Sequence, residues 1–158
     1  MVDESVFAAL AGLSVTTSLP FLLYGAWIMI DAETVSWNVL THHLWYIGTG
    51  LALTTVPIVG WMAPRLFRRL SGLAVIHAFL GLQAYALLAF ALTGIVRIFQ
   101  AKRGADLYDD PGGRDIDDLH ENMAAWRGRL RIGVFGYVIF WGFAYVVGLD
   151  RYHGLYIP

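Results

Sequence analysis

The stretch from Leu70 to Val96, LSGLAVIHAFLGLQAYALLAFALTGIV, runs for 27 residues without one Asp, Glu, Lys or Arg. A helix of about 20 residues, rising 1.5 Å per residue, crosses a hydrocarbon core of about 30 Å. Three more stretches of the 158-residue chain lack these charged residues: 5–30, 34–64 and 132–149. The sequence therefore predicts an all-α protein, a four-helix transmembrane bundle.

The overall composition agrees with a membrane protein. Hydrophobic residues make up 58% of the chain and charged residues 15%, against about 45–50% and 25% in soluble domains. The chain has no cysteine, which excludes disulfides, Cys-ligated iron–sulfur clusters and thiol nucleophiles. The net charge is −1, and no basic patch with interleaved aromatic residues is present, so no nucleic-acid partner is expected.

We expect one integral membrane domain over residues 1–158, with spans at about 6–30, 38–63, 71–99 and 132–149. An acidic polar loop, 101–127, separates the third and fourth spans. Apolar residues recur at helical spacing in its second half, from Asp115 onward, which predicts an amphipathic helix that leads directly into the last span. The N-terminus lacks the positive segment of a secretory signal, so we expect the first apolar stretch to remain as a helix.

Basic residues indicate an orientation in the cell membrane. The link between the second and third spans carries Arg65, Arg68 and Arg69. The opposite side carries Arg97, Lys102, Arg103, Arg114, Arg127, Arg129 and Arg131. Since the more basic side faces the cytoplasm, we expect a multi-pass protein with its termini outside and its long loop in the cytoplasm.

Two histidines within the predicted spans are candidates for a functional role, because ionisable residues inside a bilayer are costly. Small residues follow each on the same helix face: Gly50 and Thr54 after His43, and Gly81 after His77. A haem b between helices needs an axial ligand and room for its ring. The imidazole would supply the ligand, and the small side chains would leave the room. The same strip of small residues is also typical of close helix packing.

Because their helices run antiparallel, His43 and His77 are expected near opposite membrane faces and not on one iron. The possible partners on the matching side are His120 for His43, and Met62 or His153 for His77. We therefore take His43, His77 and His120 as possible haem ligands and expect no metal besides haem iron. An interhelical hydrogen bond or an interfacial position is the alternative role for each histidine.

Motifs of common enzymes are absent from the sequence, including HExxH, GxSxG, the P-loop and GxGxxG. The acidic loop lacks the spacing of a calcium-binding loop. No acidic pair lies in a span, where it could relay protons. We expect no catalytic activity of the chain's own.

Three short patterns resemble the transmembrane b-type cytochromes of the four-helix kind. They are His42-His43, the segment IHAFLGL at 76–82, and Leu119-His120 followed by Trp126-Arg127-Gly128-Arg129. The resemblance covers about residues 40–148. It implies that paired histidines on facing helices hold haem and that electrons cross the membrane.

The charged residues carry a second resemblance. Nine Asp against three Glu, ten Arg against one Lys, and the acidic loop make the chain similar to small haloarchaeal membrane proteins associated with bc-type respiratory complexes. This likeness implies a role in membrane electron transfer beside larger cytochrome subunits.

Three functions follow as hypotheses. The first is a small integral subunit of a respiratory electron-transfer complex of the cytochrome bc type, with the lipid bilayer and larger membrane cytochrome subunits as partners. The second is a b-type haem cytochrome that passes electrons itself, with His43 and His77 as ligands. The third is a small-molecule carrier formed by a homo-oligomer.

Overall fold

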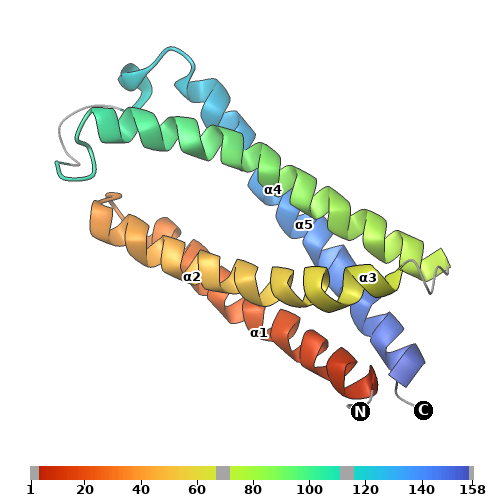
Figure 1. Cartoon of the computed structure of the whole chain (residues 1–158). Coiled ribbons are helices and arrows are strands. Elements are labelled where there is room, and N and C mark those ends of the chain that lie inside the picture. The colour runs from red at the N-terminus through yellow and green to blue at the C-terminus, as the bar shows by residue number, and fades with distance from the viewer. Residues whose placement is uncertain (1–3, 67–71, 111–115, 157–158) are drawn as a thin grey trace. The chain divides into compact units, whose positions relative to one another are not determined.

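The computed structural model describes residues 4–66, 72–110 and 116–156, and every regular element in these ranges is a helix (Figure 1). In chain order the elements are α1 (Glu4–Asp31), α2 (Trp37–Pro57), the π-helical turn η1 (Ile58–Met62), α3 (Ala63–Leu66), α4 (Gly72–Gly104), the 3-10 turn η2 (Ile116–Leu119) and α5 (Met123–Tyr156).

Four helical segments are long and apolar enough to cross a membrane. They are Glu4–Asp31, Trp37–Arg65, Gly72–Gly104 and Met123–Tyr156. Each contains one of the charge-free stretches, and the second joins α2, η1 and the start of α3. The prediction of an all-α protein with four membrane helices is confirmed.

The helices form two compact units. The first is built from α1, α2, η1 and α3, with the first residues of α4 and the last residues of α5. The second, Ile76–Val147, contains the rest of α4 and α5.

The amphipathic helix and the last span are one element, because α5 runs without a break from Met123 to Tyr156. The sequence placed the start of this helix near Asp115. Instead, η2 is followed by a turn in which the Asn122 backbone N–H donates to His120 Nδ1 at 3.1 Å. This local side-chain bond competes with helix formation, so the helix begins three residues after His120.

α4 ends in a Schellman motif at the start of the acidic loop. The Leu107 N–H donates to the Lys102 carbonyl at 3.1 Å, and the Asp106 N–H donates to the Arg103 carbonyl at 3.2 Å. Asp106 has a φ of 56°, a left-handed conformation that Asp adopts more readily than most residues with a Cβ. Tyr108 is buried beyond the motif, and this burial raises the pKa of its phenol.

Glycines allow α4 and α5 to approach closely in the second unit. A Cβ added to Gly133 would lie 2.6 Å from the Ala91 Cβ and 2.7 Å from the Leu87 carbonyl oxygen. A Cβ added to Gly94 would lie 2.5 Å from the Trp126 carbonyl oxygen. Small residues of this kind bring helix backbones together in membranes, where the hydrophobic effect does not drive helix association.

α1 and α2 pack closely in the first unit as well. A Cβ on Gly50 would lie 2.7 Å from the Leu22 side chain. One turn further along α2, the Thr54 hydroxyl donates to the Ser18 Oγ at 2.8 Å, and both residues are fully buried. Polar side chains inside the pair therefore bond to each other.

Pro57 removes one backbone donor from α2. In a regular helix the N–H of residue 57 would donate to the Leu53 carbonyl, but proline has no N–H. The Ser14 Oγ of α1 donates to this carbonyl at 2.8 Å. Since an unpaired carbonyl is expensive in hydrocarbon, Ser14 supplies the donor that Pro57 lacks.

We predict that Ser14→Ala lowers the free energy of unfolding by about 1 kcal/mol, because it leaves the Leu53 carbonyl unpaired. The cost should fall by half or more in a Pro57→Ala background, because the alanine restores the backbone donor. Unfolding in mixed micelles, followed by circular dichroism, measures this double-mutant cycle.

Thr93→Ala is the control for this cycle. The Thr93 hydroxyl bonds within its own helix, to the Phe90 carbonyl at 2.7 Å, so its removal should show no coupling to Pro57. An equal cost of Ser14→Ala in both backgrounds would contradict the compensation.

Candidate functional site

His43 is the sequence-predicted site residue with the clearest geometry. It lies half-buried on α2, and its Nδ1–H donates to the Gly25 carbonyl of α1 at 2.8 Å. A carbonyl only accepts hydrogen bonds, so this contact places the proton on Nδ1 and leaves a lone pair on Nε2. Histidines that ligate metals are commonly oriented in this way by a bond from their other nitrogen.

The small residues below His43 face α1. Gly50 packs against Leu22, and Thr54 bonds to Ser18, so side chains of α1 fill the strip. A flat ring does not fit between α1 and α2 at this level. A ligand of His43 Nε2 would have to lie on another side of α2.

His77 lies half-buried near the start of the second unit, on α4. Further along its face, Ala84 and Ala91 are buried, and Ala91 packs against Gly133 of α5. A Cβ on Gly81, by contrast, would meet no atom within 4 Å. On the helix face that follows His77, Ala84 and Ala91 are therefore used for helix packing, whereas the space beside Gly81 is open.

His120 is exposed in the turn before α5. Its Nδ1 accepts the Asn122 backbone N–H, so the ring proton is on Nε2, and its ring lies 4.4 Å from that of Trp126. In this arrangement neither ring nitrogen offers a lone pair to a metal. The observed role of His120 is to shape the turn that starts α5.

The structure does not bring His77 and His120 together. α4 and α5 run antiparallel with Ala91 beside Gly133. His77 lies about four turns from Ala91 toward one end of the pair, and His120 lies about as far from Gly133 toward the other. The 14 residues from His77 to Ala91 and the 10 residues from Met123 to Gly133 together rise about 36 Å along the helices, so the two imidazoles do not share one iron.

The other possible partners lie in the first unit. His43, Met62 and His153 all belong to it, and His153 is exposed. Within residues 4–66, 72–110 and 116–156, no three His, Asp or Glu side chains gather as a metal site.

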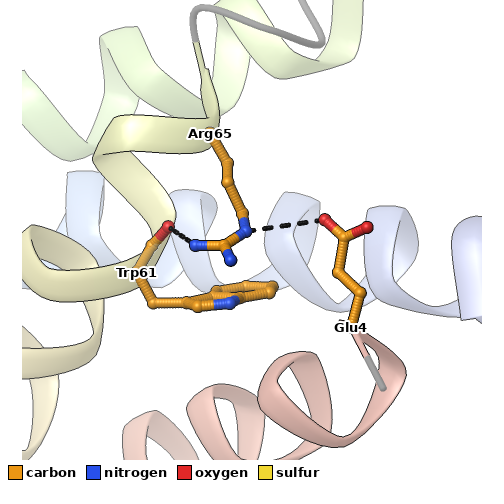
Figure 2. A network of polar contacts seen from close by, with 3 residues as sticks. All are labelled: Glu4, Trp61 and Arg65. Carbon is orange, nitrogen blue, oxygen red and sulfur yellow. Dashed lines mark hydrogen bonds and ion pairs between the residues drawn. The ribbon is translucent and has the colours of Figure 1, made fainter. Parts of the chain in front are cut away.

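A polar cluster that no sequence motif predicts lies at one end of the first unit (Figure 2). Arg65 Nε lies 3.5 Å from Glu4 Oε1, and Arg65 Nη1 donates to the Trp61 carbonyl at 3.1 Å. The guanidinium also lies 4.8 Å from the centre of the Trp61 ring. Glu4 and Arg65 are each more than one-third exposed, so their ion pair is worth less than about 1 kcal/mol.

A signal for this cluster was present in the sequence. Glu4 precedes the first charge-free stretch and Arg65 follows the second. Two antiparallel helices of similar length place these positions at the same membrane face. The pairing therefore follows from the hairpin and from no local motif.

Comparison with known proteins places the chain in a family. No curated protein and no solved structure is similar to this chain. A family described as a domain of unknown function, DUF7321, matches residues 4–157. Because this match covers nearly the whole sequence, the chain belongs to the DUF7321 family, and it has four helices that could span a membrane.

Proposed function

We propose that this protein is a small integral subunit of a respiratory electron-transfer complex of the cytochrome bc type and that it packs against larger membrane cytochrome subunits. Glycines with open space beside them carry the proposal. A Cβ added to Gly48 of α2 or Gly142 of α5 would meet no atom within 4 Å. These glycines are not needed for the packing of the helix pairs.

Gly142 lies in the middle of an exposed apolar face of α5. Its neighbours at helical spacing are Phe135, Val138, Ile139 and Val146, whose exposed fractions are 55–70%. The face is thus a row of large side chains interrupted by one notch.

Gly48 lies in a similar setting on α2, in the first unit. Leu44 and Trp45, one turn before it, are 52% and 71% exposed. A glycine inside a helix destabilises it by about 1 kcal/mol relative to alanine, and contact with lipid alone does not offset this loss. A helix of a partner subunit that packs closely against the glycine would offset the loss through van der Waals contacts.

The electron-transfer part of the proposal comes from the resemblance to membrane b-type cytochromes and to small haloarchaeal proteins of bc-type complexes. The four membrane helices are compatible with such a subunit. The notched faces support a role in packing against a protein partner.

We predict that the tagged chain, extracted from its native membrane in a mild detergent, purifies with larger haem-containing membrane subunits. Gly142→Leu fills the notch and should reduce the recovered partner at least fivefold, because a loss of about 1 kcal/mol in packing lowers an equilibrium about fivefold. Native gels and mass spectrometry measure the recovery.

Ala125→Leu is the matched control, since it adds similar bulk at an exposed position of α5 before the charge-free stretch. It should leave the partner bound. Migration of the wild-type chain as a monomer would contradict the subunit proposal, and a homo-oligomer without other proteins would favour the carrier.

A second candidate function, a b-type cytochrome, is favoured by the geometry of His43. The bond to the Gly25 carbonyl orients the imidazole and leaves Nε2 for an axial ligand position. A haem bound there would supply one-electron transfer. The chain's own contribution would be the ring orientation that α1 imposes.

The prediction for this candidate is a sharp α-band in the dithionite-reduced spectrum of the purified chain. His43→Ala should abolish the band, while His42→Ala, at the exposed neighbouring position, should keep it. A colourless wild-type protein would contradict the cytochrome, and loss of the band in both variants would argue against His43 as the specific ligand.

We also propose that the termini lie outside the cell and the long loop in the cytoplasm, as the positive-inside rule favours. The chain has no cysteine, so single cysteines report position without background. We predict that an impermeant maleimide added to intact cells labels Leu155→Cys but not Glu33→Cys or Glu121→Cys, all at exposed positions. The reverse labelling pattern would establish the opposite orientation.

A further inference from the structure

A shallow, widely open depression of about 480 Å³, called the groove below, lies along one face of α4 in the second unit. It is lined by Ala89, Leu92, Thr93, Val96, Arg97 and Gln100. These residues recur every three or four positions, so they occupy one helix face. Ala91 and Gly94, which pack against α5, occupy the opposite face. The groove therefore faces away from α5.

The chemistry of the groove changes along its length. Ala89, Leu92 and Val96 are apolar, and the Thr93 hydroxyl is already bonded to the Phe90 carbonyl. The other end presents the guanidinium of Arg97 and the amide of Gln100.

This change coincides with the expected edge of the hydrocarbon. The charge-free stretch of α4 ends at Val96, so Arg97 is the first charged residue after it. On α5, the charge-free stretch begins directly after Arg131. A Cβ added to Gly94 would lie 3.2 Å from the Leu130 nitrogen and 3.3 Å from the Arg129 Cβ, so this end of α5 lies beside Gly94. Both helices are therefore expected to leave the hydrocarbon at about this level, which places Arg97 at the expected depth of the lipid phosphates.

The charged side chains that the two helices carry at this level are basic. The acidic residues of the same unit that the structure describes lie in the loop beyond the helix ends: Asp106, Asp109, Asp110, Asp118 and Glu121. The helical residues 76–104 and 123–147 of the second unit include no Asp or Glu, and their six basic residues all lie at this end. They are Arg97, Lys102, Arg103, Arg127, Arg129 and Arg131. Among the residues that the structure describes, no ion pair of Arg97 is found, and its side chain is exposed.

We propose that the groove binds one anionic phospholipid, whose phosphate contacts Arg97 and Gln100 and whose acyl chain lies along Val96, Leu92 and Ala89. The planar guanidinium suits a phosphate, to which it donates two parallel hydrogen bonds. From Ala89 to Gln100 the helix rises about 16 Å. This length matches the headgroup of one phospholipid together with the half of its acyl chain nearest the headgroup. An apolar floor that ends in a cation matches this amphiphile in both parts.

The test is titration of the delipidated wild-type chain with phosphatidylglycerol or phosphatidylcholine, with adducts counted by native mass spectrometry. We expect one phosphatidylglycerol to bind before any phosphatidylcholine. Arg97→Gln should weaken this first site about fivefold or more, as for one arginine near an anionic surface. Ala89→Trp should weaken it with the charge unchanged, because the indole fills the apolar end.

Arg129→Gln is the matched control, because it removes the same charge at the same level from α5, outside the groove. It should change the affinity less than twofold, and circular dichroism should confirm that all variants are folded. Equal weakening by Arg97→Gln and Arg129→Gln would overturn the site in favour of a diffuse positive field. Equal binding of both lipids, or displacement of the lipid by equimolar inorganic phosphate, would also overturn it.

Discussion

Each backbone carbonyl in hydrocarbon needs a donor from the protein itself, since no water is present to supply one. Helices meet this need for almost all of the spans. The exception shows how strict the need is: Pro57 leaves the Leu53 carbonyl without its helical donor, and Ser14 of the neighbouring helix provides one. The register of α1 against α2 therefore places Ser14 beside the carbonyl that Pro57 leaves without a backbone donor. For the same reason, the buried hydroxyls of Ser18 and Thr54 bond to each other inside the pair.

The glycines divide into two groups with different consequences. Gly25, Gly50, Gly94 and Gly133 lie where a Cβ would clash with the neighbouring helix, so they hold the two helix pairs together. Gly48 and Gly142 lie in exposed apolar faces and contact nothing across them. The first group accounts for the close approach within each helix pair, and the second is the main support for the proposal that another membrane protein packs against this chain.

The histidines show which part of a haem-ligand prediction can be made from the pattern of residues along one helix. His43, His77 and His120 were selected because imidazoles near small residues suit haem. The observed contacts separate them. His43 keeps the Nε2 lone pair, His120 uses Nδ1 to shape a turn, and about 36 Å of helical rise lies between His77 and the start of the turn that holds His120. The tautomer of His43 and the distance between His77 and His120 depend on the partner helix and its register, and neither is visible in the spacing of residues along one helix.

The lengths of the charge-free stretches were sufficient to predict the helix class and the four membrane helices, because the bilayer thickness imposes a length on any helix that crosses it. The helical spacing of apolar residues predicted that the amphipathic helix continues into the last span, although this helix begins at Met123 and not near Asp115. The spacing of residues along one helix did not predict that side chains of α1 occupy the space beside Gly50 and Thr54. It also did not predict that Glu4 pairs with Arg65. These contacts join residues up to 61 positions apart. They depend on the side-by-side register of two helices, which close side-chain packing selects and which a pattern within either helix does not contain.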